Sequence, residues 1–523
     1  MSLKEFCKIL DGNICYKPIE FKMPGEVDGR MFDVVTDSRD VKEGSIFICL
    51  KGEFHDGHDY VVQAIDNGGR IIIVAQDRQA DVMKAVDESK AEGALIISVK
   101  SPLYAMGELA KWYIAFLGVK TIGITGSVGK TTVKDMVASI FSQSMNTYKT
   151  KGNFNSLIGL PLTALSVPRG TELCVFELGM DAEGEIDRLS EIMAPDIAII
   201  TKIGISHVER LGSRENIFRA KSEIINHIKP GGTLILGVDE DEQYLKKEKF
   251  DGNFNVIEVT TKDCSGTDSG LYCVKNIRDD VDGVCFEFSG GDCKKSLVNV
   301  NTHGIHNALN AGLATACGIR FGMDLEKIKE GLRNVDFTAK RLEIKEKGGI
   351  TFIDDSYNAS PESMSSALRV LGQIAEGRKV AVLGDMNELG GDSENFHMEV
   401  GELAFEQGVE KLIAVGEKGK SYIKGFLKAV KARGFELEIG KIEEVENSIG
   451  VKKILDCKNV DELSVGVFSG TQYIIYLDRP VEIAWIEDAE KCRSKFRKYI
   501  KRGDWVLLKA SNALKLSCIL EDR

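Results

Sequence analysis

Short apolar runs alternate with amphipathic stretches along most of the chain. Each run has about the length of a buried strand, and the stretches between them have the spacing of a helix with one apolar face. This alternation is typical of βαβ units, and it predicts an α/β protein built on mostly parallel sheets. The strands that we expect are 70–75, 121–125, 173–177, 196–201, 233–236, 351–353, 379–383 and 411–415.

The pattern changes between about residues 250 and 300, where segments such as Val284 to Phe288 alternate apolar and polar side chains. Alternation with a period of two predicts antiparallel strands with one exposed face. A chain of 523 residues is also too long for one ordinary domain. We therefore predict an N-terminal domain over 1–103, a central domain over 104–336 and a C-terminal domain over 337–523.

The composition narrows the classes of function. The net charge is -12, and an acidic chain repels the phosphate backbone of nucleic acids unless its positive charge is gathered in one place. No apolar run reaches the roughly 18 residues that span a bilayer, and the first residues lack the core of a signal peptide. The 12 cysteines include no CxxC pair, so we expect reduced thiols and no zinc site. These observations predict a cytoplasmic protein that neither binds nucleic acid nor inserts into a membrane.

A glycine-rich segment lies between the predicted strand 121–125 and a predicted helix. Glycines at such a junction let backbone N–H groups approach a phosphate, and the helix dipole adds to the attraction. We expect Lys130 to reach the β- and γ-phosphates and Thr131 to place its hydroxyl on Mg²⁺. A glycine turn can also be purely structural, and Ile124 stands where the strict pattern has its first glycine, but the GKTT sequence favours nucleotide binding. The segment comprises Thr125, Gly126, Ser127, Val128, Gly129, Lys130, Thr131 and Thr132.

Several further motifs follow the glycine-rich segment in a fixed order. GITGSVGKTT is followed by GNFN with IGLP (152–161), by ELGM (177–180), by SHVERLGSRENIFRAK (206–221) and by GIHNALN (304–310). Taken together, these motifs resemble those of the Mur ligase superfamily, the ATP-dependent amide-forming enzymes of peptidoglycan precursor synthesis. The resemblance extends from residue 36 to about residue 512. It implies an N-terminal UDP-substrate α/β domain, a central P-loop mononucleotide-binding domain and a C-terminal Rossmann-like domain.

The resemblance also implies roles for individual residues. Lys130, Glu177, His207 and Lys221 match the catalytic residues, and ATP would be bound by the glycine-rich segment with Asn153, Asn307, Asn310, Arg341 and Asp355. Two Mg²⁺ ions are implied. One would be held by Thr131 and Glu177, and the other by His207 and a carbamylated Lys221.

Two motifs of the C-terminal third point to the substrates. DSYNASPES (355–363) and GDMNELG (384–390) are similar to elements of the superfamily member that joins D-alanyl-D-alanine to UDP-MurNAc-tripeptide through an acyl phosphate. The resemblance places Tyr357, Asn358, Ser360, Asn387 and Glu388 on the side of the second substrate. TDSR (36–39) and DGHDY (56–60) resemble the UDP-sugar elements, which implies contacts from Ser38, Arg39, Asp56 and His58. We expect a monomer.

Other interpretations stay open at this point. The chain could be another amide ligase of the superfamily, such as a MurE-like, folylpolyglutamate or cyanophycin-type enzyme, although the DSR and GDMNELG elements speak against these. It could also be a nucleotide-dependent switch or scaffold that has lost ligase chemistry. Three departures from the family pattern bear on the choice: Asp181-Ala182 stands where some relatives have Asn-His, Lys340 replaces the glycine usual before Arg341, and KASN (509–512) stands where KGSR is typical. In addition, residues 436–500 carry no motif of the family.

Overall fold

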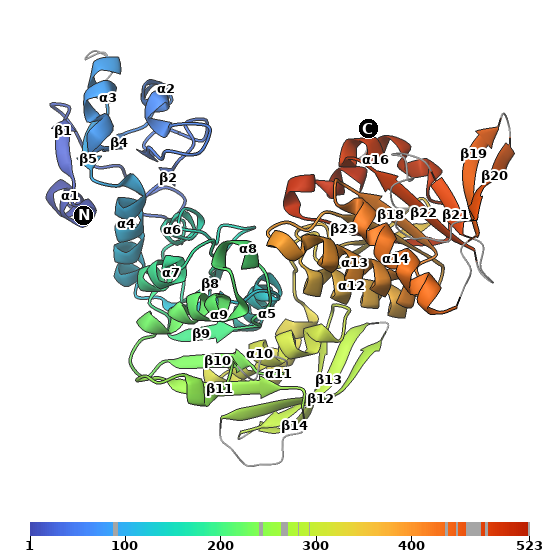
Figure 1. The fold of residues 1–523 in the computed structure, drawn as a ribbon. Helices are drawn as coiled ribbons and strands as arrows, with labels where there is room; N and C mark the ends of the chain where they lie inside the picture. Colours follow the sequence, from blue (N-terminus) through green and yellow to red (C-terminus); the bar gives the residue numbers. More distant parts are fainter. Residues whose placement is uncertain are drawn as a thin grey trace.

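The fold is taken from a computed structural model of the full chain. It describes residues 1–86, 93–239, 244–262, 270–280, 282–291, 293–434, 438–445, 448–456, 472–475 and 480–520. Three sheets follow one another along the chain, and each is covered by helices (Figure 1). Within these ranges, no helix combines the length and the apolar character needed to cross a bilayer.

The first sheet has five strands in the order β1-β5-β4-β3-β2. Its centre is parallel, and β1 is antiparallel to β5. The strands are β1 (Asn13–Tyr16), β2 (Val34–Val35), β3 (Ile46–Ile48), β4 (Ile71–Ala75) and β5 (Leu95–Val99), and the helices are α1 (Leu3–Leu10), α2 (Val61–Asp66) and α3 (Gln79–Ala85).

Helix α4 (Pro102–Leu117) connects the first sheet to the second. Its N-cap is Ser101, whose hydroxyl accepts from Tyr104 N, and Pro102 occupies the first turn, where its missing N–H costs nothing. Met106, Leu109 and Tyr113 are fully buried in a core that continues from the first sheet into the second. The predicted division at residue 103 falls just inside this helix.

The second sheet has nine strands in the order β14-β13-β12-β11-β10-β9-β6-β8-β7. Strands β7 to β12 pair in parallel, and β12, β13 and β14 pair antiparallel. The strands are β6 (Lys120–Thr125), β7 (Thr147–Lys149), β8 (Leu173–Glu177), β9 (Ile197–Ile200), β10 (Thr233–Gly237), β11 (Asn255–Thr260), β12 (Leu271–Asp280), β13 (Gly283–Gly290) and β14 (Cys293–Val300). The helices that pack on it include α5 (Lys130–Ser142), α6 (Gly159–Leu165), α7 (Glu185–Met193), α8 (Val208–Leu211), α9 (Arg214–Ser222), α10 (His306–Arg320) and α11 (Leu325–Arg333).

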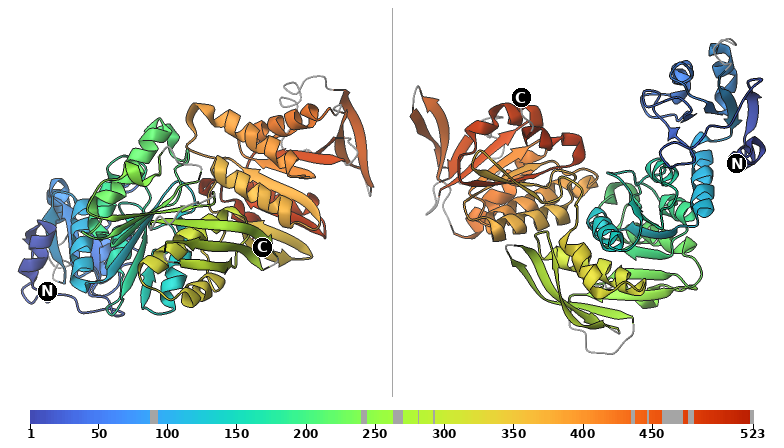
Figure 2. Two further views of the ribbon diagram at one scale, coloured as in Figure 1. Left: turned by 90° about the horizontal axis from the view of Figure 1, so that it is seen from below. Right: turned by 180° about the vertical axis from the view of Figure 1, so that it is seen from behind.

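The third sheet also has nine strands, in the order β15-β16-β23-β17-β18-β22-β21-β19-β20. Five central strands are parallel, and the antiparallel pair β19–β20 lies at the edge far from the N-terminal sheet (Figure 2). The strands are β15 (Glu343–Lys347), β16 (Ile350–Asp354), β17 (Arg378–Gly384), β18 (Lys411–Val415), β19 (Glu438–Val445), β20 (Ser448–Asp456), β21 (Gln472–Ile475), β22 (Val481–Ile486) and β23 (Asp504–Lys509). Its helices include α12 (Pro361–Ile374), α13 (Ser393–Glu406), α14 (Gly419–Ala432) and α16 (Ala489–Lys495).

The eight predicted strands are all present, and the α/β class is confirmed. Two expectations were wrong. Strand β11 pairs in parallel with both neighbours although it lies in the region 250–300, because the parallel sheet runs on through it before the chain turns back at β12. Cys273 is disulfide-bonded rather than a free thiol, whereas nine other described cysteines are free. The absence of a CxxC pair could not reveal this, since a disulfide needs proximity in space and not in sequence.

Glycines bring helices α13 and α14 into backbone contact. A Cβ atom on Gly425 would overlap the Met398 carbonyl oxygen, and one on Gly401 would overlap the Tyr422 carbonyl oxygen. In contrast, a Cβ atom on Gly372 in α12 would meet chiefly the flexible side chain of Gln407.

We predict that Gly425→Ala destabilises the α13–α14 pair by about 3 kcal/mol, at the upper end of overpacking costs, because backbone must move to admit the methyl group. Gly372→Ala should change stability by less than about 1 kcal/mol, since the neighbour can move and alanine favours a helix. Hydrogen exchange of residues 393–432 measures both. Equal exchange rates in the two variants would contradict the prediction.

Candidate active site

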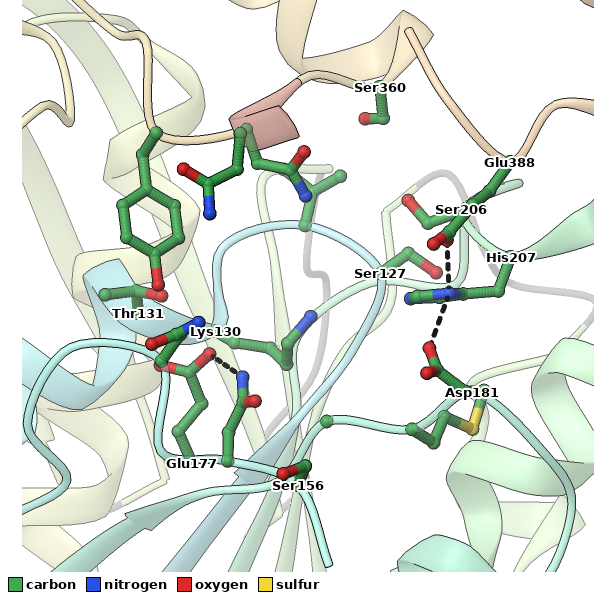
Figure 3. A pocket seen from close by; sticks show the side chains of 18 of the residues that line it. Ser127, Lys130, Thr131, Ser156, Glu177, Asp181, Ser206, His207, Ser360 and Glu388 are labelled. Carbon is green, nitrogen blue, oxygen red and sulfur yellow. Dashed lines mark hydrogen bonds and ion pairs between the residues drawn. The ribbon is translucent and has the colours of Figure 1, made fainter. Parts of the chain in front are cut away.

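A cleft of about 660 Å³ lies between loops of the second and third sheets (Figure 3). It brings together many of the residues singled out in the sequence. These are Ser127, Val128, Gly129, Lys130, Thr131, Thr132, Asn153, Glu177, His207, Arg341, Tyr357, Asn358, Ser360, Asn387 and Glu388. The cleft is not lined by Thr125, Gly126, Lys221, Asn307, Asn310 and Asp355. The four predicted UDP-sugar residues lie in the N-terminal domain, Ser38 and Arg39 in the connection from β2 to β3, and Asp56 and His58 at a 3-10 turn (Gly57–Tyr60) after β3.

The glycine-rich segment connects β6 to α5 as a strand–loop–helix unit. Gly126 and Gly129 have φ values of 145° and 89°, where residues with a side chain are strained. A Cβ atom on Gly126 would also overlap the hydroxyl of Thr201. Lys130 Nζ donates to the Gly126 carbonyl oxygen at 2.8 Å, so the lysine lies folded over the loop at the start of the helix. The glycines are displaced from the positions of the strict P-loop pattern, but the loop still has the form of a phosphate cradle.

Glu177 ends β8 beside this loop and is 3% exposed. Its Oε1 accepts from Asn155 Nδ2 at 2.9 Å, while its Oε2 has no hydrogen-bond partner (Figure 3). Lys134 Nζ lies 3.9 Å from that Oε2 and is itself buried without a hydrogen bond. The sequence analysis missed Lys134. The only available signal was its spacing of four residues from Lys130, which puts both lysines on one face of α5.

Positive charge is concentrated around the loop. Burial lowers the pKa of Lys130, and Arg341 lowers it further, against an opposing effect of Glu177. Lys221, in α9, is 1% exposed, and burial together with the charge of Lys130 puts its pKa well below the usual value. A buried lysine in this setting is readily neutral and nucleophilic.

His207 lies between two carboxylates from different sheets. Its Nδ1 is 2.6 Å from Oε2 of Glu388 and 3.7 Å from Oδ1 of Asp181 (Figure 3). One ligand atom from each of the three residues lies within 4.8 Å of the others, an arrangement that can hold a metal ion. The contact with His207 lowers the pKa of Glu388. From the sequence, His207 was paired with Lys221, and Asp181 was given no role at a metal because only the fold brings it near His207.

Arg341 crosses from the third domain to the phosphate loop. Its Nη2 donates to Thr131 Oγ1 at 3.3 Å, and its guanidinium lies 4.1 Å from the centre of the Tyr357 ring. Lys340 and Leu342 on either side have φ values of 65° and 51°. The left-handed backbone at Lys340 is a conformation that glycine adopts without strain.

Asp355 is paired inside the protein. Its Oδ2 lies 2.5 Å from Lys509 Nζ, and its Oδ1 accepts from Leu342 N at 3.2 Å. Burial lowers the pKa of Lys509, and the aspartate opposes that effect. The lysine that opens the KASN segment thus neutralises the residue predicted to hold the ribose, while Ser511 and Asn512 line the cleft.

Asn307 and Asn310 lie on the first turns of α10. Asn310 Nδ2 donates to Asn307 Oδ1 at 2.9 Å, and a Cβ atom on Gly129 would come within 2.7 Å of the Asn310 amide. The helix start therefore packs directly on the phosphate loop.

His303, three residues before the start of α10, pairs with Asp279 at 2.8 Å. It also lines a second cavity of about 360 Å³ beside the connection to the third domain. Sequence reasoning missed both residues.

The predicted UDP-sugar residues differ in how far their polar groups are already bonded within the protein. Both ring nitrogens of His58 are engaged, by Asp56 at 2.5 Å and by the backbone N–H of Ala75 at 2.9 Å. Ser38 donates to Gln63 at 2.9 Å, and the exposed Arg39 pairs with neighbouring Asp37. Arg39 is the most accessible of the four.

The geometry defines a class of protein. A phosphate loop, a buried carboxylate and an arginine from the following domain line one cleft. This arrangement is typical of enzymes that transfer a phosphoryl group from a nucleotide in a cleft between two domains. Comparison with known proteins specifies the family. The chain matches the models for the Mur ligase family catalytic domain over residues 33–113, the Mur ligase middle domain over 124–318 and the glutamate ligase domain over 340–454. The chain belongs to the Mur ligase family.

Particular relatives agree with this assignment. The UDP-N-acetylmuramoyl-tripeptide–D-alanyl-D-alanine ligase of Bacillus subtilis is 39% identical over 398 residues, which cover 76% of this chain and 82% of the relative. The crystal structure of MurF from Acinetobacter baumannii is 25% identical, with a TM-score of 0.77 and coverage of 99% and 97%. The MurF ligase of Thermotoga maritima, solved in complex with ADP, is 25% identical, with a TM-score of 0.71 and coverage of 95% and 97%.

His397 holds the loop that carries Asn387 and Glu388. Its Nε2 accepts from Met386 N at 3.0 Å, and its Nδ1 lies 2.6 Å from the Ser393 carbonyl oxygen, so the neutral ring fits both partners. Burial lowers its pKa to about 4.

The unfolded chain binds a proton at His397 between about pH 6.5 and pH 4, where the folded chain does not. Stability should therefore be lost as the pH falls through this window, by about 1.4 kcal/mol per unit from this group. His397→Gln should reduce the slope of unfolding free energy against pH by about that amount. An identical slope in both proteins between pH 6.5 and 4 would refute the prediction.

Proposed function

We propose that this enzyme joins D-alanyl-D-alanine to UDP-N-acetylmuramoyl-tripeptide with hydrolysis of ATP to ADP and phosphate. One observation carries the proposal from the structural side. Buried polar atoms without a hydrogen-bond partner converge on the cleft, and buried groups of this kind call for a ligand. Within the described residues they include Ser127 Oγ, Glu177 Oε2 and Arg341 Nε, and the equally unpartnered Lys134 Nζ lies 3.9 Å from that Glu177 oxygen. The names of the relatives supply the substrates.

The donor set fits ATP with a bound cation. Backbone N–H groups of the glycine-rich segment and Lys130 would hold the phosphates, and Arg341 would approach them from the other domain. The hydroxyl of Thr131 and the free Oε2 of Glu177 offer the oxygen ligands that Mg²⁺ prefers. Bound there, Mg²⁺ would neutralise charge on the phosphates. Asn307 and Asn310 support the loop from behind, and the adenine is expected near them.

A second cation would lie nearer the reacting carboxylate. His207, Asp181 and Glu388 are grouped closely enough to hold one. We propose in addition that Lys221 is carbamylated. Its low pKa favours the neutral amine that reacts with CO₂, and the product anion would turn repulsion from Lys130 into attraction. The carbamate would supply an oxygen ligand.

The proposed chemistry has two steps. A carboxylate oxygen of the tripeptide attacks the γ-phosphorus of ATP, the bond to the β-phosphate oxygen breaks, and ADP leaves. The amine of D-alanyl-D-alanine then attacks the acyl phosphate, the carbon–oxygen bond breaks, and phosphate leaves with loss of one proton from the nitrogen. Both steps bring anions together, so Lys130 and Arg341 act mainly by positioning and by stabilising negative charge.

The substrates would approach from opposite sides of the phosphate loop. Ser38 and Arg39, between β2 and β3, are proposed for the UDP group, with Asp56 and His58 bracing that region. Tyr357, Asn358, Ser360, Asn387 and Glu388 are proposed for the dipeptide side. A cytoplasmic location, a monomeric state and the domain boundaries at 103 and 336 remain predictions.

Phosphate release from ATP should require both UDP-MurNAc-tripeptide and D-alanyl-D-alanine. Lys130→Ala and Glu177→Gln should each lower the rate at least about 100-fold, because each removes charge stabilisation in the transition state. A colorimetric phosphate assay measures this. Release that does not depend on the dipeptide would contradict the assignment and favour a nucleotide-dependent switch.

Carbamylation of Lys221 has its own test. Protein equilibrated with ¹³C-bicarbonate should show a carbamate carbonyl resonance that is absent in Lys221→Ala, and that variant should lose at least about 100-fold in ligation rate because a cation ligand is removed. Lys229→Ala, at a half-buried ion pair with Asp196, serves as the control and should keep both the resonance and the rate. A resonance that persists in Lys221→Ala would overturn the proposal.

A further inference from the structure

The connection between the second and third domains is fastened to the phosphate-loop helix by one buried carboxylate. Asp135, in α5, is 1% exposed. Its Oδ2 accepts from both Thr338 N and Thr338 Oγ1, each at 2.8 Å. Its Oδ1 accepts from Lys149 Nζ at 2.7 Å, and the same ammonium donates to the Asp336 carbonyl oxygen at 3.3 Å. Residues 336–338 are therefore held at three points.

The same face of α5 carries the contact with Arg341. Thr131 and Asp135 are four residues apart, so their side chains lie one turn apart on one face of the helix. Thr338 and Arg341 are three residues apart in the connection, and they bind Asp135 and Thr131 respectively. The connection thus runs along α5 from its second turn to its first.

The backbone between these contacts leaves Arg341 little freedom. Lys340 and Leu342 both have left-handed φ values, and Leu342 N donates to Asp355. Residues with a side chain keep this strained conformation only where the surrounding contacts hold them in place. Displacing Thr338 would therefore displace the guanidinium of Arg341 relative to Thr131.

We propose that Asp135 is a positioning residue, which holds Thr338 against α5 so that Arg341 reaches the phosphates of the nucleotide. The inference rests on the proposed function, because it assumes that the loop binds ATP. Asp135 itself does not line the cleft, and its effect passes through Arg341. Helix α5 thus fixes the position of both the phosphate loop at its start and the connection to the third domain.

A double-mutant cycle tests the proposal. Asp135→Asn and Arg341→Ala should each lower the kcat/KM for ATP by about 10- to 100-fold, the scale expected when a catalytic group is misplaced. The double variant should lie within about threefold of Arg341→Ala alone, since both changes remove the same interaction. Losses that multiply would overturn the proposal. The same cycle in the Kd for ATP gives a readout that does not need ligation.

Asp196 provides the matched control. Its Oδ2 accepts from Thr121 N at 3.0 Å, Thr121 Oγ1 at 3.3 Å and Lys229 Nζ at 2.8 Å, which reproduces the donors of Asp135 at the opposite end of β6 from the loop. Asp196→Asn should leave the Kd for ATP within about twofold of wild type, and any loss should multiply with that of Arg341→Ala. Coupling as strong as that of Asp135 would show a general loss of stability and overturn the proposal.

Variants of Thr338 keep the test valid if Asp135→Asn folds poorly. Thr338→Ser retains the hydroxyl and should match wild type, whereas Thr338→Val should raise the Kd for ATP by about threefold to tenfold because one hydrogen bond to a carboxylate is lost. Equal affinity in the two variants would contradict the inference. Wild-type protein that binds ATP but forms no amide would overturn only the proposed reaction, and wild-type protein that binds no nucleotide would overturn both.

Discussion

Buried positive charge is gathered around the phosphate loop. The cleft is lined by Lys130, Arg341 and the buried carboxylate of Glu177, and Lys134 lies 3.9 Å from that carboxylate. Lys130 and Lys221 have lowered pKa values because burial and a neighbouring cation oppose the charge of each. Such an arrangement is costly until anions enter it. The chain as a whole carries a charge of -12, so the positive charge is strictly local. ATP, the peptide carboxylate and a carbamate are anions of the required kind.

Charged groups of the third domain also make the contacts with the second domain. Glu362, at the start of α12, accepts from Ile205 N at 3.0 Å, and Glu388 contacts His207 two residues further along. Arg341 reaches Thr131 from the connection. Carboxylates of the third domain thus hold the loop that carries His207, while Arg341 of the same domain reaches the phosphate loop. His207 and Glu388 both have left-handed backbone, and strain of this kind is concentrated at functional sites.

Local features could be predicted from the sequence. The strand before the phosphate loop, the glycines and Lys130 are adjacent in the chain, and their geometry follows from backbone rules. The predicted strands are present because buried parallel strands leave continuous apolar runs. The resemblance to the family also identified Arg341, Glu177 and Glu388 as site residues, which their spacing in the sequence could not have shown.

Features that depend on tertiary contacts escaped prediction. Asp135 and Thr338 are 203 residues apart in the sequence, and Asp279 and His303 are 24 apart on different elements. Nothing in the residues beside Asp355 shows that Lys509 neutralises it. Lys134 was hidden for a different reason, since a lysine on a helix usually faces solvent and only the fold shows that this one is buried beside Glu177.

We expect the positive charge around the phosphate loop, completed by Arg341 from the third domain, to bind the phosphates of the nucleotide. Titration calorimetry with ATP, ADP and AMP tests this most directly. Affinity should fall steeply from ATP to AMP in the wild type, and Arg341→Ala should narrow that difference by at least about tenfold, since an ion pair in a partly buried site is lost. Equal affinity for ATP and AMP, or an unchanged difference in the variant, would contradict the account.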